Sequence, residues 1–137
     1  MKLTLLTFFL LGFTVAQSQN ITIPDANFKA YLVANTAINT NSDSEISKAE
    51  AEAFTGSMDC SWKSISNLTG IEAFINITSL NFEYNNVTTL DLSANKKLQS
   101  LYSNGNSLTA LDLTALTEFK KLECSYNKIT SLNLTKN

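Results

Sequence analysis

The C-terminal half of the sequence repeats itself every 21 residues, and this repeat restricts what the chain can fold into. The segments that begin at Leu80, Leu101 and Leu122 are LNFEYNNVTTLDLSANKKLQS, LYSNGNSLTALDLTALTEFKK and LECSYNKITSLNLTKN, and they align without a gap. A unit of this length cannot bury its apolar residues alone. The units are therefore expected to stack on one another and to share a continuous core.

Each unit follows the pattern L-x-x-L-x-L-x-x-N-x-L-x-x-L-x-L, which is the pattern of leucine-rich repeats. The first L-x-L predicts a short strand with both apolar side chains on one face, because side chains alternate along a strand. The Asn that follows is Asn85, Asn106 or Asn127. Its amide can donate and accept hydrogen bonds, so we expect stacked Asn side chains to satisfy turn backbone of their own and adjacent units. The second L-x-L predicts an extended segment on the convex side, since a unit this short has no room for a full helix.

A more divergent unit, MDCSWKSISNLTGIEAFINITS, begins at Met58 and has Lys63 where the later units have Asn. That difference fits the first unit of a stack, where one neighbour is missing. The sequence therefore predicts an α/β leucine-rich repeat solenoid of about three and a half units, each of about 21–22 residues, with short parallel strands. The predicted units are residues 58–79, 80–100, 101–121 and, in part, 122–137.

Two segments precede the repeats. Residues 1–18 have a Lys near the start, an apolar run and the small-x-small site AQS, which together are typical of a secretory signal peptide. Residues 19–57 predict a small helical cap for the open end of the solenoid. Pro24 and Asp25 suit the first turn of a helix that should end near Asn35. Ser47 and Glu50 have the spacing of a capping box at the start of a second helix.

The loop between these two helices, residues 39–50, has the ligand spacing of an EF-hand calcium loop. Asn39 and Ser44 weaken the match, because a strong site would have Asp and Gly there. Ordinary turns and a capping box explain the same residues without a metal. The sequence thus leaves open a loop that requires no cofactor and a weak Ca²⁺ site. The candidate ligands are Asn39, Asn41, Asp43, Glu45, Ser47 and Glu50.

Cys60 and Cys124 are expected to be free thiols buried in the core as small apolar residues. They occupy the same inward position three units apart. Strand spacing would place them roughly 14 Å from each other, whereas a disulfide requires Cα atoms within about 7 Å.

The outward residues of the strands form the candidate binding surface, on the concave side of the solenoid. Tyr is a common anchor in recognition surfaces, so Tyr102 is the first choice for a contact. Trp62, near the first strand, could serve as a second anchor or cover the open end of the stack, and cover is the expected role. The candidate contact residues are Asn81, Glu83, Tyr102, Asn104, Lys121, Glu123 and Tyr126.

Composition argues against several other functions. The chain has no His, and no Ser or Cys lies beside a recognisable base, so an enzyme is not expected. Its net charge of −2 gives no reason to expect nucleic acid as a partner. No apolar run is long enough to predict a membrane span.

The predicted mature chain resembles secreted bacterial leucine-rich repeat proteins of the internalin-like type. The motifs that carry the resemblance are IPDANFKAYLV, INTNSDSEISKAEAEAFTGS, ISNLTGIEAF and the repeats LTALDLT and TSLNLTKN. The resemblance implies a helical cap with an EF-hand-like loop, followed by a curved solenoid that binds proteins or glycans on its concave face. It further implies a secreted or cell-surface protein that acts in adhesion or recognition.

A structural alternative remains open beside the binding module. The chain has fewer units than its relatives, which fits a truncated or capping fragment of a larger repeat adhesin with no activity of its own. An uncapped C-terminal end would expose apolar residues and a strand edge. This end would then favour self-association.

Overall fold

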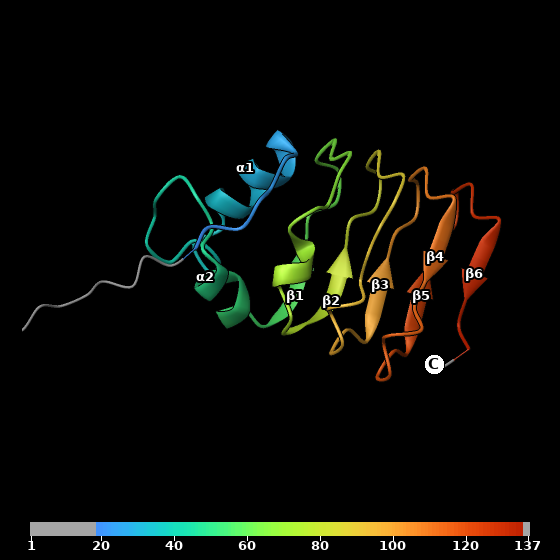
Figure 1. Ribbon diagram of the computed structural model, residues 1–137. Helices are drawn as coiled ribbons and strands as arrows, with labels where there is room; N and C mark the ends of the chain where they lie inside the picture. The colour runs from blue at the N-terminus through green and yellow to red at the C-terminus, as the bar shows by residue number, and fades with distance from the viewer. Residues whose placement is uncertain (1–18, 136–137) are drawn as a thin grey trace, which may run out of the picture.

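A computed structural model of the protein describes residues 19–135, so the signal peptide expected at residues 1–18 lies outside the described residues. A helical cap lies at one end, and a stack of coils extends from it (Figure 1). Within residues 19–135, no helix has both the length and the apolar character needed to cross a membrane.

The cap contains two short helices, α1 (Ala26–Ala34) and α2 (Lys48–Ala53). Asp25 lies just before α1 as its N-cap, and its carboxylate accepts hydrogen bonds from the N–H groups of residues 27 and 28. The sequence placed Asp25 in the first turn, but its extended backbone puts it one position outside the helix. The predicted helix end near Asn35 and the capping box of Ser47 and Glu50 are confirmed.

Asp25 also joins the cap to the first coil. Its second carboxylate oxygen accepts hydrogen bonds from the Ser66 N–H and hydroxyl, both at 2.8 Å, and from the Asn67 N–H at 3.1 Å. Partial burial opposes ionisation of Asp25, but the hydrogen bonds from Phe28, Ser66 and Asn67 outweigh it and lower the pKa of this carboxyl. One ionised side chain therefore caps a helix and holds that helix against the solenoid.

The coils contribute a parallel sheet with the order β1–β2–β3–β5. The strands are β1 (Gly56–Asp59), β2 (Ile77–Asn81), β3 (Ser100–Tyr102) and β5 (Lys121–Glu123). The register pairs Leu80 with Leu101 and Leu101 with Leu122, as a repeat without gaps requires. This arrangement confirms the predicted leucine-rich repeat solenoid with short parallel strands.

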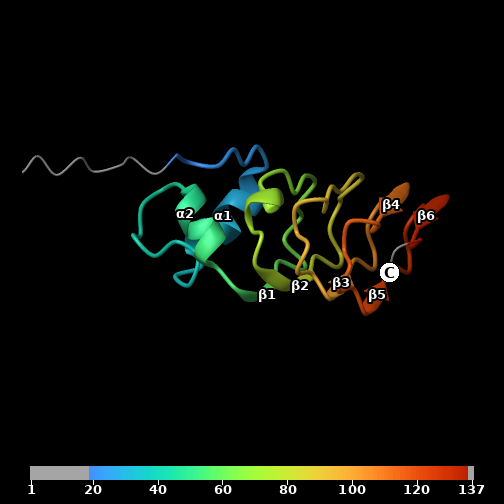
Figure 2. The same cartoon turned by 60° about the horizontal axis from the view of Figure 1, so that its bottom comes forward.

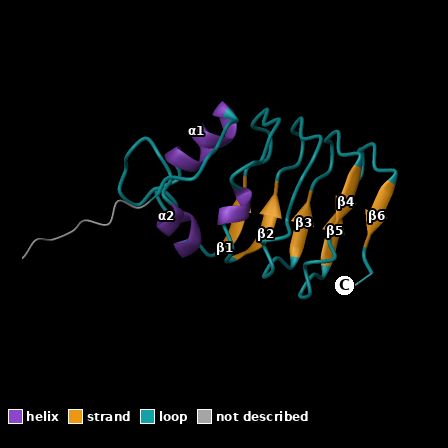
Figure 3. Ribbon diagram, viewed as in Figure 1, coloured by secondary structure: helices purple, strands orange, loops and turns teal. Residues whose placement is uncertain are grey.

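A second, smaller parallel sheet pairs β4 (Ala110–Asp112) with β6 (Ser131–Asn133). Figure 2 shows it across the coils from the four-stranded sheet, and Figure 3 shows the strands of both sheets in orange. These strands contain the first Leu of the second L-x-L of their units, Leu111 and Leu132, so the predicted extended segment is confirmed there. In the first coil the 3₁₀ turn η1 (Ile71–Ala73) occurs before β2.

A continuous apolar core runs from the cap into the coils. It joins side chains of α1, the cap loop and the inward positions of the strands, so the cap covers the first coil's open end. Its largest fully buried members are Phe28, Leu32, Ile38, Ile46, Met58, Ile65, Leu68, Ile71, Phe74, Ile77, Leu80 and Phe82.

The predicted Asn ladder is present and links the coils. The Asn106 amide accepts a hydrogen bond from the N–H of Val87 at 3.0 Å and donates to the carbonyls of Phe82 at 3.0 Å and Ser103 at 3.2 Å. Asn85 and Asn127 repeat this pattern one coil earlier and one coil later. Each Asn thus satisfies backbone in its own coil and in the coil before it.

The first coil needs no Asn of its own. The Asn85 side-chain oxygen accepts hydrogen bonds from the N–H groups of Lys63 at 3.1 Å and Ile65 at 2.9 Å. Lys63 can therefore occupy the Asn position with its side chain exposed.

Both cysteines are free, as predicted from their separation. Cys60 is fully buried, and burial raises the pKa of its thiol to about 12. Cys124 is only half-buried, so the prediction of a buried thiol is wrong for it. It lies beside β5, in the last coil of the four-stranded sheet, which has a neighbouring coil on only one side within residues 19–135.

We expect Asn106→Ala to lower the free energy of unfolding by about 2–3 kcal/mol, because it leaves the buried Val87 N–H without its partner. Urea denaturation would measure the loss. Asn86→Ala is the matched control, since Asn86 is an exposed Asn next to the ladder. Equal losses for the two variants would contradict the role of the ladder.

Candidate binding face

The outer surface of the four-stranded sheet, here called the strand face, presents the side chains that alternate with the buried Leu residues. The register places Asn81, Tyr102 and Glu123 in one row across three coils. Ser79, Ser100 and Lys121 form a second row beside it. The strand face is therefore a regular polar surface whose positions are fixed by the stacking of the coils.

A chain of hydrogen bonds crosses this face through Asn104. Its amide nitrogen donates to the carboxylate of Glu83 and, at 3.3 Å, to that of Glu123. Its amide oxygen accepts a hydrogen bond from the N–H of Ser125 at 2.7 Å. Asn104 thus holds two carboxylates from the neighbouring coils on either side of it.

Lys121, on strand β5, extends these contacts to Glu123 and Tyr102. Its ammonium lies 2.9 Å from the Glu123 carboxylate and 4.7 Å from the centre of the Tyr102 ring. The hydrogen bond with Glu123 raises the pKa of Lys121, and the same bond lowers the pKa of Glu123. Both groups are exposed, so the pair contributes little to stability. It does hold the charges and the Tyr102 ring in one arrangement.

Five of the predicted contact residues therefore form one connected group: Glu83, Tyr102, Asn104, Lys121 and Glu123. Asn81 lies beside Tyr102, but its side chain accepts a local hydrogen bond from the Glu83 N–H at 3.0 Å. Tyr126 lies beyond the strand end and is 83% exposed. The connected group is called the polar network below.

A second set of residues on this side was not recognised from the sequence as a unit. The rings of Trp62 and Tyr84 stack with centroids 4.1 Å apart and planes at 20°. Trp62 is 71% exposed, so its expected role as cover for the open end of the stack is wrong. The cap helices cover that end instead, and the indole packs on the next coil.

Alignment of the coils shows why these residues meet. Trp62, Tyr84, Gly105 and Tyr126 each immediately precede the ladder position, and all four have positive φ, from 53° to 66°. We call them the aromatic row, with Gly105 as its one non-aromatic position. Tyr84 lies over Gly105 so closely that a Cβ there would be 2.7 Å from the Tyr84 ring. The sequence alignment of the units already places these four residues at one equivalent position. It does not show that the rings stack, because the stacking depends on contacts between coils.

In the cap loop, the structure gives Glu50 a role that needs no metal. One carboxylate oxygen accepts hydrogen bonds from the Thr40 N–H and hydroxyl and from the Asn41 N–H. The other accepts them from the Ser47 N–H and hydroxyl. Burial opposes ionisation of Glu50, but these bonds from Ser47, Asn41 and Thr40 lower its pKa.

The other predicted ligands are also engaged with one another or with neighbours. The Asn41 side-chain amide donates a hydrogen bond to the Asp43 carboxylate, and its oxygen accepts one from the Asp43 N–H. Glu45 forms an ion pair with Lys29. The Asn39 amide nitrogen donates to the Asp43 carbonyl, but its buried oxygen has no partner. No cluster of three or more acidic, His or Cys side chains suited to a metal is found in the part of the chain that the structure describes. The carboxylates of Asp43, Glu45 and Glu50 are thus all engaged in hydrogen bonds or an ion pair within the cap.

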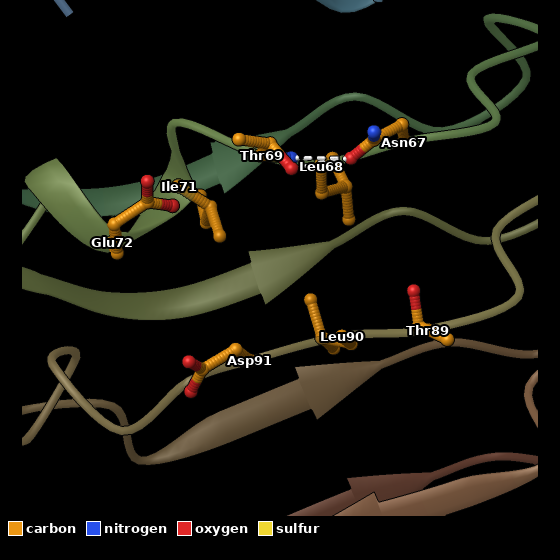
Figure 4. A pocket seen from close by; sticks show the side chains of 8 residues that line it. All are labelled: Asn67, Leu68, Thr69, Ile71, Glu72, Thr89, Leu90 and Asp91. Carbon is orange, nitrogen blue, oxygen red and sulfur yellow. Dashed lines mark hydrogen bonds between the residues drawn. The ribbon is translucent and has the colours of Figure 1, made fainter. Parts of the chain in front are cut away.

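A shallow pocket of about 230 Å³ lies away from the strand face, between the first and second coils (Figure 4). Its polar groups serve local turns: the side chain of Asn67 accepts from the N–H and hydroxyl of Thr69, and Glu72 accepts from the N–H of Gly70. It brings together none of the residues predicted to bind a ligand.

No family model matches the sequence. The chain is 42% identical to Internalin J of Listeria monocytogenes over 79 residues, which are 58% of this chain and 8% of that protein. The fold is similar to the solved functional domain of InlJ from Listeria monocytogenes, which includes a cysteine ladder, with a TM-score of 0.76 and 40% identity. That match covers 87% of this chain and 26% of the solved chain.

The internalin InlF of Listeria monocytogenes is also similar, with a TM-score of 0.67 and 25% identity over 82% of this chain and 36% of that chain. The chain thus spans well under half the length of each of these relatives.

Proposed function

Because this chain is similar to internalins in sequence and in its leucine-rich repeat fold, we propose that it is a secreted or cell-surface binding module. Its strand face recognises a protein or a glycan in adhesion, and it performs no catalysis. The observation that carries this proposal is the polar network, in which Asn104 fixes the carboxylates of Glu83 and Glu123.

The polar network suits recognition because its groups are ordered before a ligand arrives. Side chains already held by hydrogen bonds lose less conformational freedom on binding than free ones, which lowers the cost of association. Tyr102 adds a large amphipathic ring beside the charges, and Tyr is enriched among residues that dominate interfaces. Because Lys121 is paired with Glu123, the network has an excess of negative charge, which does not favour nucleic acid as a ligand.

A structural role for the cap loop accompanies this proposal. The carboxylate of Glu50 closes residues 40–50 by accepting N–H and hydroxyl groups from both ends of the loop. A calcium ion would have to displace these bonds in order to use the same oxygens. We propose that the cap loop requires no cofactor and that any Ca²⁺ affinity is weak, about millimolar.

The last described coil offers a surface for self-association. Leu132 and Leu134 are each 43% exposed. Strand β6 is also at the edge of its two-stranded sheet, and such an edge can pair with another chain. We propose self-association through this coil as a second kind of contact, independent of the strand face.

We expect Asn104→Ala to reduce binding of the fluorescently labelled protein to cell surfaces at least tenfold, because it releases both carboxylates. Flow cytometry would measure the binding. Thr89→Ala, in the pocket away from the strand face, is the control and should bind like the wild type. If Asn104→Ala binds cell surfaces as well as the wild type does, the polar network is not the recognition site.

We expect Glu50→Gln to lower stability at neutral pH by about 1–2 kcal/mol, the usual size of a capping loss. The folded pKa of Glu50 is depressed, so its contribution is present above the unfolded pKa of about 4.3 and lost as pH falls through the folded value. Thermal melts should therefore show that the difference in melting temperature between variant and wild type becomes smaller below about pH 4.

The same melts test the metal. For a dissociation constant of about 1 mM, calcium at that concentration adds only about 0.4 kcal/mol. A much larger gain over a chelator control, absent in Glu50→Gln, would show a strong calcium site and contradict our assignment.

We expect the mass of the protein from light scattering to rise with concentration, and Leu132→Ser to reduce the rise because it removes exposed apolar surface. Ile75→Ser is the control, since Ile75 is 39% exposed in a different coil. A concentration-independent monomer would exclude this contact.

A further inference from the structure

We propose that the aromatic row binds neutral oligosaccharides by stacking sugar rings on its exposed aromatic faces. This inference rests on the proposed function and names the class of ligand for one edge of the strand face. It starts from the Trp62–Tyr84 stack and from Tyr126, none of which the core uses.

The row exposes flat aromatic surface on a rigid support. Trp62 stacks one ring face on Tyr84 and is still 71% exposed, so its other face is open to solvent. Tyr84 is held between Trp62 and Gly105. Tyr126 is 83% exposed. A pyranose ring has an apolar C–H face that packs against such surfaces, whereas hydroxyls occupy its edge.

The backbone of the row indicates that the aromatic residues are not there for the fold. Trp62, Tyr84 and Tyr126 have φ of 56°, 53° and 56°, in the left-handed region. This region is costly for a bulky residue, by about 1–2 kcal/mol. Gly105 occupies the equivalent turn in the third coil at φ 66° without that cost. Residues held in strained backbone conformations cluster at active sites and ligand clamps.

The neighbours of the row supply the hydrogen bonds that sugar hydroxyls need. Glu83 immediately precedes Tyr84, and Asn104 immediately precedes Gly105. Carboxylate oxygens accept from hydroxyls, and an amide both donates and accepts. Both groups are already held in the polar network. Binding sites of this kind combine apolar surface with a few placed polar groups.

Charge selects among oligosaccharides. Glu83 and Glu123 lie in the polar network, and Lys121 is paired with Glu123, which leaves an excess negative charge beside the row. A sialylated or sulfated glycan would meet this charge and be disfavoured. The structure therefore favours neutral sugars over acidic ones.

Trp62 is the only Trp in the chain and reports directly on the row. We would titrate the protein with lactose, cellotetraose and maltotetraose and follow Trp62 emission, with 3′-sialyllactose as the acidic counterpart of lactose. We expect at least one neutral probe to change the emission saturably at millimolar concentrations, and any response to lactose to exceed that to 3′-sialyllactose.

Two variants locate the binding. Tyr126→Ala removes an exposed ring, so it should fold normally and weaken binding of the responding probe at least tenfold. Tyr84→Ala should have a similar effect, with circular dichroism to confirm folding. Tyr31→Phe, a conservative change in the cap, is the aromatic control and should leave binding unchanged.

The proposal is overturned if no neutral probe changes the emission, or if both row variants bind as the wild type does. It is also overturned if Tyr126→Ala abolishes cell-surface binding that protease treatment of the cells removes, while the sugars have no effect. In that case the row binds protein. The proposed function fails separately, when Asn104→Ala leaves cell-surface binding intact.

Discussion

The hydrogen bonds of Asn85, Asn106 and Asn127 are the interaction on which the rest of this structure depends. A turn that enters the interior would leave backbone groups unpaired, and each amide supplies them with partners in two coils at once. These bonds reach backwards along the chain, so each coil is completed by the one that follows it. The first coil can consequently do without an Asn, and Lys63 takes the position at no loss of hydrogen bonding.

The surface features follow from this internal ladder. Because successive coils stack in register, Glu83, Asn104 and Glu123 come from three coils and still lie within hydrogen-bonding distance. The residue before each ladder position must turn with positive φ, and this turn carries the rings of Trp62, Tyr84 and Tyr126 on the outside. The same local geometry therefore satisfies the interior and arranges the exterior. Where the solenoid meets the cap, Asp25 has a comparable double role. One of its carboxylate oxygens caps α1, and the other accepts a hydrogen bond from the first coil.

The repeat predicted the solenoid well because its period fixes both strand register and inward positions. Leu80, Leu101 and the Asn ladder could be placed without knowing any contact. The cap helices were likewise close to prediction, since Ser47 and Glu50 act within four residues of each other. Trp62 could not be placed in this way, because a long side chain can turn toward the core or toward the next coil. The polar network was predicted as separate candidates, but its pairing depends on side-chain conformations that a period does not specify.

The loop at residues 39–50 shows another limit of pattern matching. The spacing of a calcium loop and that of a capping box share Glu50, and the spacing does not specify which groups its carboxylate faces. That carboxylate points to N–H and hydroxyl groups of Thr40, Asn41 and Ser47. Cys124 illustrates a related point, since the repeat assigns it an inward position but the number of neighbouring coils decides how deeply it is buried.

The contact between Trp62 and Tyr84 has an optical consequence. The two rings lie 4.1 Å apart and nearly parallel, yet they belong to different coils. Transitions of chromophores this close couple, and excitation of the phenol passes to the indole. Separation of the first two coils should then change the near-ultraviolet circular dichroism and the ratio of tyrosine to tryptophan emission. These changes should occur while the far-ultraviolet circular dichroism of the remaining coils is still native. Partial opening of the solenoid beside the cap would be visible in this protein without any added label.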